Sequence, residues 1–462
     1  MKTLDFKNSV YDLVHAYPDV RDVLADLGFK DITNPMMLNT FGKKMTIPKG
    51  AKVKGIDMNA VIAKFNENGF AVINAFPSKE SMERQAEIKS LLKRLHDGES
   101  MESVQAEFKQ KFSDVSSREI AEAEQGLILE GVNPREVQKL CDVHSVMFHG
   151  AIREEEEAPE LKDIKGHPLY IMWKENDAIE ALAKEIRKVE LVPENVDHLK
   201  DLLKKMKGLK QHYGKKEELY FRKLEKYGIS GPTTVMWGVD DEIYANISGM
   251  ERTVNAENIS SLSDKLNKTL DRLEEMIFKE ENILFPMAAE NFTDEEWAEV
   301  YHDMDEMGYC LITDVPRWEN APEWHNPNEI SSSETIIHMP TGSFNAAQLE
   351  GILRTMPMDI TFVDDQDIVR FFTNGKERIF PRPTSALGKE LWGCHSPKTV
   401  PMIRKLISDF REHKRTSYER IINKENFLVL VRYYAIYDPD GKYLGTLETS
   451  QNLFPYKKEL SR

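Results

Sequence analysis

Apolar residues recur at steps of three and four positions along most of the chain, a spacing that places them on one face of a helix. Short helices are predicted at 10–15, 19–27, 58–68 and 101–112, and a longer one at 79–95. Further along, the same period covers 168–189, 193–224, 235–248, 259–285 and 294–305. Four long helices in succession are typical of an antiparallel bundle.

Near the C-terminus the pattern changes to short runs of β-branched and aromatic residues. Residues 359–364 and 368–373 are two such runs, separated by a turn of Asp and Gln, and they predict a hairpin. Residues 427–437 and 443–449 predict two more strands, joined by an Asp-Pro-Asp-Gly turn. We therefore expect a small α+β domain with an antiparallel sheet.

These patterns divide the chain into segments. An acidic run at 154–160 and a run rich in Asn, Pro, Glu and Ser at 318–333 mark two of the boundaries. The expected segments are a small N-terminal helical domain (1–75), a second helical domain (80–150), a four-helix bundle (151–312), a linker (313–340) and the α+β domain (341–455). The expected fold is thus mainly α, with an α+β domain at its C-terminal end.

Composition limits the classes of partner. The 462 residues carry a net charge of -16, which argues against nucleic acid or an anionic membrane, since both select for basic surfaces. No apolar run reaches the ~18 residues of a membrane-spanning helix. Cys141, Cys310 and Cys394 are few and scattered, as expected of reduced thiols, and the first residues lack the apolar core of a signal peptide. A cytoplasmic protein is expected.

Two glutamate pairs in the predicted bundle are the main candidates for chemistry. Glu217 and Glu218 follow His212, and Glu280 and Glu281 stand just before an Ile-Leu-Phe-Pro cluster. An apolar cluster after each pair is expected to anchor its helix end in a core. His212 and Glu217 are five positions apart, so both can reach one metal centre from adjacent turns. One of Glu280 and Glu281 is expected to point inward, because the apolar cluster follows directly. Inward-facing carboxylates and imidazoles from several helices hold transition-metal pairs in helical bundles. The alternative is that the glutamates form a solvated face and His212 is incidental.

Two further histidines lie in helical context. His167 precedes Pro168, and proline favours a first helical turn, so His167 is expected at a helix entrance as a cap or a metal ligand. His144 lies on an apolar face with Leu140 and Val143. A buried histidine needs a partner there, which is a metal in one interpretation and an ordinary hydrogen bond in the other.

Several segments carry a resemblance to known families. Residues 140–310 resemble the hemerythrin-type cation-binding helical bundles through HPLYIMWKEN, HYGKKEELYF, MWGVDDEI and EEMIFKEENILFP. Residues 80–150 resemble an uncharacterised bacterial domain that precedes such bundles. The N-terminal segment resembles a small domain related to di-iron proteins of iron–sulfur cluster repair. The C-terminal part resembles PAS sensor domains through DITFVDDQDIVRFFT, FPRPTSALG, GCHSPKTV and DPDGKYLGTLE.

The resemblance implies a metal site in a hemerythrin-like bundle, with departures from the family pattern. Asp240 and Met276 stand where the family places histidines in the last two helices. The implied ligands are His144, His167, His212, Glu217, Asp240, Glu280 and Glu281. This carboxylate-rich set favours non-heme iron, as a di-iron centre in one interpretation, with manganese or zinc as alternatives. Loss of the site is a further alternative.

A PAS-like domain implies a pocket for heme, flavin or a small molecule. His395 is a candidate heme ligand; alternatively, Cys394 and His395 only shape a turn. Three functions follow as expectations. The first is a metal-binding sensor or stress-response protein that responds to O2, NO or peroxide, with the PAS-like domain binding a small-molecule or gaseous ligand or forming a homodimer. The second is a di-metal enzyme or iron donor in cluster repair, and the third is a heme-binding PAS sensor.

Overall fold

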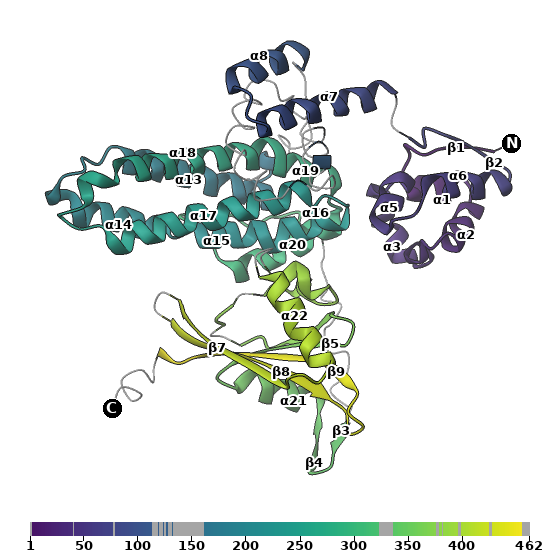
Figure 1. Ribbon diagram of the computed structural model, residues 1–462. Helices are drawn as coiled ribbons and strands as arrows, with labels where there is room; N and C mark the ends of the chain where they lie inside the picture. Colours follow the sequence, from purple (N-terminus) through teal and green to yellow (C-terminus); the bar gives the residue numbers. More distant parts are fainter. Residues whose placement is uncertain are drawn as a thin grey trace. The chain divides into compact units, whose positions relative to one another are not determined.

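The computed structural model describes residues 2–39, 41–76, 79–112, 161–322, 336–375, 378–380, 382–395, 399–424 and 427–454, and a few single positions between 119 and 132. The chain divides into two compact units, residues 1–323 and 324–462 (Figure 1). His144 and the acidic run 154–160 lie outside the described residues. No helix in the described part of the chain is long and apolar enough to cross a membrane.

The N-terminal part packs short helices beside a two-stranded parallel sheet. Strand β1 (Lys2–Asp5) pairs with β2 (Phe70–Ile73), and neither strand was predicted from the sequence. Between them lie α1 (Val10–Ala16), α2 (Asp19–Asp26), η1 (Lys30–Thr33), α3 (Pro35–Asn39), α4 (Phe41–Lys44), α5 (Ile47–Lys54) and α6 (Met58–Glu67). Helix α5 forms in a segment rich in Gly, Pro and Lys because Thr46 caps it, proline occupies its first turn, and Gly55 ends it at φ 65°.

Two helices follow, α7 (Lys79–His96) and α8 (Met101–Lys111). Both were predicted from the sequence, α7 from its apolar period. Ile88 and Leu91 of α7 are buried, as are Val104 and Phe108 of α8, and all four belong to one apolar cluster. The apolar face that the sequence predicted for α7 is thus a packing face.

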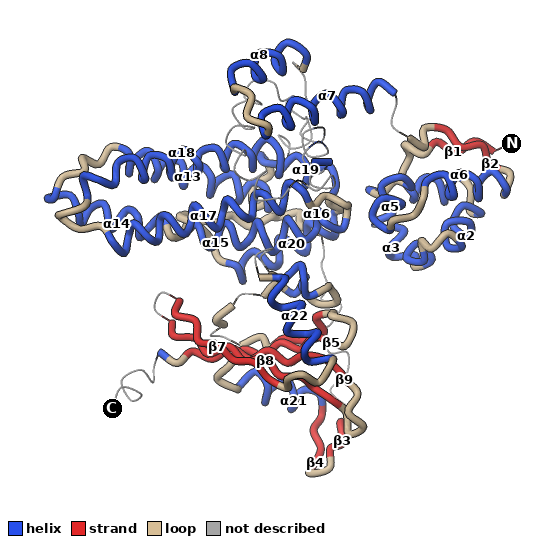
Figure 2. The backbone as a smooth tube through the Cα atoms, in the orientation of Figure 1, coloured by secondary structure: helices blue, strands red, loops and turns tan. Residues whose placement is uncertain are grey.

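The bundle is built from α13 (Pro168–Arg187), α14 (Val196–Met206), α15 (Leu209–Lys215), α16 (Arg222–Lys226), α17 (Gly231–Thr253), α18 (Ser263–Lys279), α19 (Phe285–Asn291) and α20 (Asp294–Met307). The turns η2 (Pro193–Asn195) and η4 (Ile259–Leu262) precede α14 and α18. The long helices run side by side (Figures 1 and 2). The predicted fold class, mainly α with a C-terminal α+β domain, is confirmed. The predicted second helix, 193–224, is interrupted at Lys207 and Gly208 between α14 and α15.

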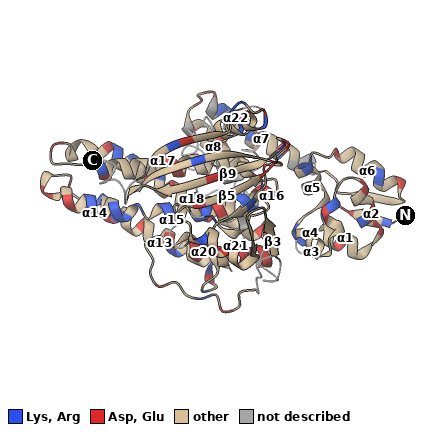
Figure 3. Ribbon diagram, turned by 90° about the horizontal axis from the view of Figure 1, so that it is seen from below, with Lys and Arg blue, Asp and Glu red and all other residues tan. Residues whose placement is uncertain are grey.

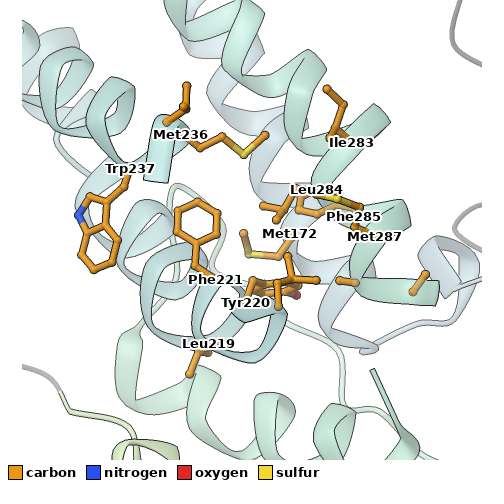
Figure 4. Packing of buried hydrophobic residues seen from close by; sticks show 14 of the residues in the cluster. Met172, Leu219, Tyr220, Phe221, Met236, Trp237, Ile283, Leu284, Phe285 and Met287 are labelled. Carbon is orange, nitrogen blue, oxygen red and sulfur yellow. The ribbon is translucent and has the colours of Figure 1, made fainter. Parts of the chain in front are cut away.

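Two turns of the bundle are π-helical: η3 (Lys216–Phe221), between α15 and α16, and η5 (Glu280–Leu284), between α18 and α19. Each contains one of the Glu-Glu pairs followed by apolar residues. Figure 4 shows Tyr220 and Phe221 from the first turn near Leu284 from the second and the adjoining Phe285, and all four are buried. The apolar cluster after each glutamate pair therefore anchors its helix end in the core, as expected.

The C-terminal unit contains a five-stranded antiparallel sheet. Its strands are β5 (Asp359–Asp364), β6 (Val369–Phe372), β7 (Ser417–Lys424), β8 (Phe427–Tyr437) and β9 (Tyr443–Asn452), in the order β6-β5-β9-β8-β7. Helix α22 (Val400–Arg411) packs on one face through Ile403 and Ile407, which contact Val363 of β5 in one apolar cluster. Short 3-10 turns, η6 (Thr384–Ala386) and η7 (Leu391–Cys394), lie in the connection before α22.

The predicted hairpin of β5 and β6 and the β8–β9 pair are present in antiparallel register. Strand β7 was not predicted, because this edge strand carries charged residues such as Glu419 and Arg420 in place of a clear apolar alternation. A small hairpin, β3 (Ile336–Met339) and β4 (Gly342–Asn345), precedes α21 (Ala346–Thr355). Strand β3 lies within the segment 313–340 that was predicted to be a linker.

Candidate functional site in the helical bundle

Six ionisable side chains meet in the interior of the bundle, and each is at most 1% exposed. They come from four separate parts of the chain. They are Glu175 of α13, His212 and Lys215 of α15, Lys216 of η3, Asp240 of α17 and Glu280 of η5. We call these residues the charged cluster.

His212 is the centre of the charged cluster. Its Nδ1 lies 2.7 Å from Glu175 Oε2, and its Nε2 lies 2.9 Å from Glu280 Oε2. A carboxylate oxygen accepts hydrogen bonds, so each ring nitrogen donates when both glutamates are ionised, and His212 is then an imidazolium. Burial opposes this charge, but Glu280 and Glu175 outweigh it and raise the pKa of His212 to about 8.

The two lysines extend the cluster in both directions. Lys215 Nζ donates to Glu175 Oε1 at 2.8 Å and to the Gly308 carbonyl. Lys216 Nζ donates to Asp240 Oδ1 at 2.7 Å and to Glu280 Oε1 at 2.5 Å. The order of residues through these contacts is Lys215, Glu175, His212, Glu280, Lys216 and Asp240. Cations and carboxylates therefore alternate, three of each.

The carboxylates of the cluster differ in how strongly they are held in the charged form. Burial favours neutral Glu280, but Lys216 and His212 outweigh it and lower its pKa to about 2. For Glu175, burial is likewise outweighed by His212 and Lys215, and its pKa is lowered. Burial raises the pKa of Asp240 to about 7 even though Lys216 opposes the shift. Asp240 Oδ2 has no hydrogen-bond partner among the described residues.

The first residue of each π-helical turn belongs to the charged cluster. Lys216 begins η3 and Glu280 begins η5, and both side chains point into the charged cluster and bind each other. A π-turn inserts an extra residue into the helical repeat, which changes the face that the following residues occupy, and such turns are frequent at functional sites. The two π-turns are thus joined by a contact between their first residues, Lys216 and Glu280.

The structure brings together three of the seven predicted ligands: His212, Asp240 and Glu280. Glu217 is half-buried, and burial and the nearby Asp240 raise its pKa well above the usual range. Glu281 is half-buried and accepts a hydrogen bond from Asn176 at 3.3 Å; burial raises its pKa to about 7.

His167 is at the predicted helix entrance, where it acts as a cap. Its Nδ1 accepts a hydrogen bond from the Leu169 backbone N–H at 3.1 Å, and its ring packs against Trp297 and Trp318. Burial lowers its pKa to about 3, which keeps the ring neutral. Of the two roles that the sequence left open, the structure shows the capping role.

Three members of the charged cluster were missed: Glu175, Lys215 and Lys216. A signal for Glu175 was present, because it stands four residues from both Ile171 and Ile179 on a buried apolar stripe of α13. The lysines gave no comparable signal, because lysine is almost never fully buried unless it is paired.

The C-terminal unit contains a second polar interior. Glu448 of β9 lies opposite Thr361 of β5 and Tyr433 of β8, and Thr361 shares a strand face with Val363, which packs against α22. Glu448 Oε2 accepts a hydrogen bond from Arg382 Nη2 at 3.0 Å, and both side chains are mostly buried. Burial and Glu448 raise the pKa of Tyr433.

His395, the candidate heme ligand, is half-buried next to η7. Its Nδ1 donates a hydrogen bond to the Leu391 carbonyl at 3.1 Å. The nearby Trp392 ring has the Arg404 guanidinium 3.9 Å from its centroid. This arrangement agrees with a structural role in the turn, the alternative stated from the sequence.

Family models identify the parts of the chain. Residues 167–288 match the model of the hemerythrin HHE cation binding domain. The bundle is a hemerythrin HHE domain. Residues 349–453 match a PAS domain, so the C-terminal sheet belongs to a PAS domain. Residues 88–154 match a family of unknown function (DUF438), and residues 4–62 match a domain of unknown function (DUF1858).

Comparison with solved structures gives short matches. A C-terminal domain from Streptococcus mutans is 26% identical, with a TM-score of 0.27, and the match covers 28% of this chain and 98% of that one. A PAS domain from Colwellia psychrerythraea is 16% identical, with a TM-score of 0.20, covering 24% and 97%. A sensory box sensor histidine kinase from Vibrio cholerae is 12% identical, with a TM-score of 0.18, covering 22% and 88%. No curated protein matched the chain.

The hemerythrin family implies a bound cation, and the charged cluster does not fit one as it stands. An imidazolium has no lone pair for a metal, and both nitrogens of His212 face carboxylates. The carboxylates of Glu175, Asp240 and Glu280 already bind lysine ammonium groups. In the described part of the chain, no group of three or more His, Cys, Asp or Glu side chains is arranged to hold a metal ion.

Proposed function

We propose that this protein is a cytoplasmic sensor in which the PAS domain binds a small polar ligand and the hemerythrin bundle is the helical module that accompanies it. The two family matches support this pairing of a sensory domain with a cation-binding-type bundle. Basic and acidic positions are interspersed along the elements in the view of Figure 3, and the chain is acidic overall. Such a charge favours a small-molecule ligand over a nucleic-acid partner.

One observation carries the proposal of ligand binding: the Arg382–Glu448 pair in the PAS interior. Removing two charges from water costs more than packing apolar groups of the same size, so a buried pair adds little to stability. The same strand face has buried hydroxyl groups at Thr361, Thr446 and Ser450. A few convergent polar groups in an otherwise apolar interior are what a small-molecule site requires.

The pair indicates a class of ligand. A molecule with one anionic and one cationic group, such as a free amino acid, would offer its carboxylate to Arg382 and its ammonium to Glu448. Each protein charge would then exchange one ionic partner for another and remain paired, which limits the cost of opening the existing contact.

The test is ligand binding by the full chain. Thermal shift against a panel of free amino acids, with native mass spectrometry of the protein as purified, should detect a bound zwitterion. Binding should be lost in Glu448→Gln, while Glu419→Gln, on the exposed face of edge strand β7, should retain it. A Soret band that disappears in His395→Ala would replace this proposal with a heme sensor. A wild-type chain that binds neither class contradicts the sensor function.

The resemblance to the hemerythrin family implies iron, and the bundle is the part of the chain that would bind it. The second candidate function, a di-metal enzyme or an iron donor, needs exchangeable coordination positions on a metal. The cation-binding description of the family is the observation in its favour. The donors of the charged cluster are engaged with His212, Lys215 and Lys216, so the sensor is the function that the geometry supports better.

A further inference from the structure

The two lysines of the charged cluster lie where a bundle of this kind holds metals. Metal sites in helical bundles lie in the core between carboxylates of facing helices. Lys216 Nζ joins Asp240 of α17 to Glu280 of η5. Lys215 Nζ joins Glu175 of α13 to the Gly308 carbonyl at the end of α20. Each ammonium thus bridges two helices, as a bound cation would.

We propose that the ammonium groups of Lys215 and Lys216 replace the metal cations of the hemerythrin family, so that this bundle is assembled and held without a bound metal. Two protein cations and the His212 imidazolium supply the positive charge that the three carboxylates require. The inference is independent of what the PAS domain binds.

Charge balance explains why a metal is excluded. Lys216 Nζ lies 2.7 Å from Asp240 Oδ1 and 2.5 Å from Glu280 Oε1, so a divalent ion between the two carboxylates would be in direct contact with the ammonium group. Two positive charges that close repel strongly in a buried site of low dielectric constant. Binding would require Lys216 to leave. Its side chain is fully buried, with Nζ 4.6 Å from the centroid of the Tyr213 ring, so leaving means displacing packed residues.

The order of the cluster adds a second reason. Glu280 binds His212 through one oxygen and Lys216 through the other, and Glu175 does the same with His212 and Lys215. Both glutamates therefore use both oxygens on protein cations. Expelling Lys215 would release one oxygen of Glu175, and expelling Lys216 would release one oxygen of Glu280 and one of Asp240; in either case His212 would keep the other oxygen of the glutamate.

The test compares lysine variants with a buried control. Lys216→Ala and the double variant Lys215→Ala/Lys216→Ala remove the ammonium groups and leave carboxylates that favour Mn²⁺ or Fe²⁺. Lys223→Ala is the matched control. Lys223, in α16, is also buried, but it pairs with Glu299, which lies outside the charged cluster. Each full-length protein is incubated without air with Mn²⁺ or Fe²⁺ and desalted, and its metal content is measured by mass spectrometry.

We expect the wild type and Lys223→Ala to contain no stoichiometric metal after desalting. Lys216→Ala and Lys215→Ala/Lys216→Ala, the lysine-cluster variants, should each retain at least one ion per chain. Stoichiometric metal in the wild type that is lost in Glu280→Ala would overturn the proposal, and this measurement needs no folded lysine variant. Folded lysine-cluster variants that stay free of metal would also overturn it, because the lysines would then not be what excludes the metal.

Discussion

His212 and Glu280 lie 68 positions apart in the sequence, and their side chains meet at 2.9 Å inside the hemerythrin bundle. Glu280 also binds Lys216, so a single carboxylate links the second and fourth long helices through two protein cations. Glu280 follows the last residue of α18 and is the first residue of the π-turn η5. Two residues that were predicted as metal ligands are thus part of a network of ion pairs.

The first prediction concerns the cost of breaking this network. Lys216→Met should lower the free energy of unfolding by about 3–5 kcal/mol, because Asp240 and Glu280 are left buried with less compensation. The double variant Lys216→Met/Asp240→Asn should recover part of this loss, since it removes one charge of each sign. Urea denaturation of the two single variants and the double variant measures the coupling. Strictly additive losses would contradict the ion pair.

The second prediction concerns pH. Burial lowers the pKa of His167 to about 3 in the folded chain, from the ordinary histidine value of about 6.5. Between these values the unfolded state binds a proton that the folded state does not, so stability falls as the pH decreases from about 6.5 toward 3. The His167 contribution has a slope of about 1.4 kcal/mol per pH unit.

His167→Asn tests this contribution, because asparagine also caps helix N-termini. In this variant the free energy of unfolding should no longer fall with decreasing pH by the His167 contribution, whatever its value at neutral pH. His198→Asn, at an exposed position, should keep the wild-type dependence on pH. Urea denaturation between pH 4 and 7 gives the slopes. An unchanged slope in His167→Asn would show that the buried neutral ring is wrongly assigned.

The third prediction concerns the PAS sheet. Gly445 has φ 151°, and a Cβ atom there would lie 2.2 Å from the Val363 carbonyl oxygen of the neighbouring strand. Gly445→Ala should therefore lower the free energy of unfolding of the PAS domain by about 1–3 kcal/mol, through backbone strain. Gly249→Ala is the control, since a Cβ at that helical position meets nothing within 4 Å.

Because the chain divides into two compact units, the effect of Gly445→Ala should be confined to one of them. Hydrogen exchange should show faster exchange in β5, β8 and β9 and unchanged exchange in α13 and α17. Loss of protection throughout the bundle would contradict this independence.

The sequence predicted the fold class because helical and strand periods are properties of local residue order. It also predicted that the apolar runs after the glutamate pairs anchor the helix ends, which the burial of Phe221 and Phe285 confirms. The inward-facing residue after His212 was not predicted in this way. Lys216 stands four residues after His212, so a helix places both side chains on one face, and Lys216 points into the cluster, where it binds Asp240. The sequence instead favoured Glu217, because a carboxylate is a metal ligand and a lysine is not.

The charged cluster was only half predictable for a related reason. His212 and Glu280 were predicted because imidazoles and carboxylates are recognised as ligands, and Asp240 was predicted through the resemblance to the hemerythrin family. Lysines normally lie at the surface, so the sequence did not predict Lys215 and Lys216 as buried partners. Their role depends on carboxylates from α13 and α17, which only the tertiary structure brings to them.

The most direct test of the account is the thermal unfolding of the wild-type full-length chain with and without metal. A ligand that binds the folded state stabilises it in proportion to the logarithm of its concentration over Kd. If Lys215 and Lys216 replace the metals, the melting temperature of the bundle will be the same after treatment with a chelator and after addition of excess Fe²⁺ or Mn²⁺ without air. A melting temperature that falls on chelation and returns on adding metal, in the wild type but not in His212→Ala, would contradict it.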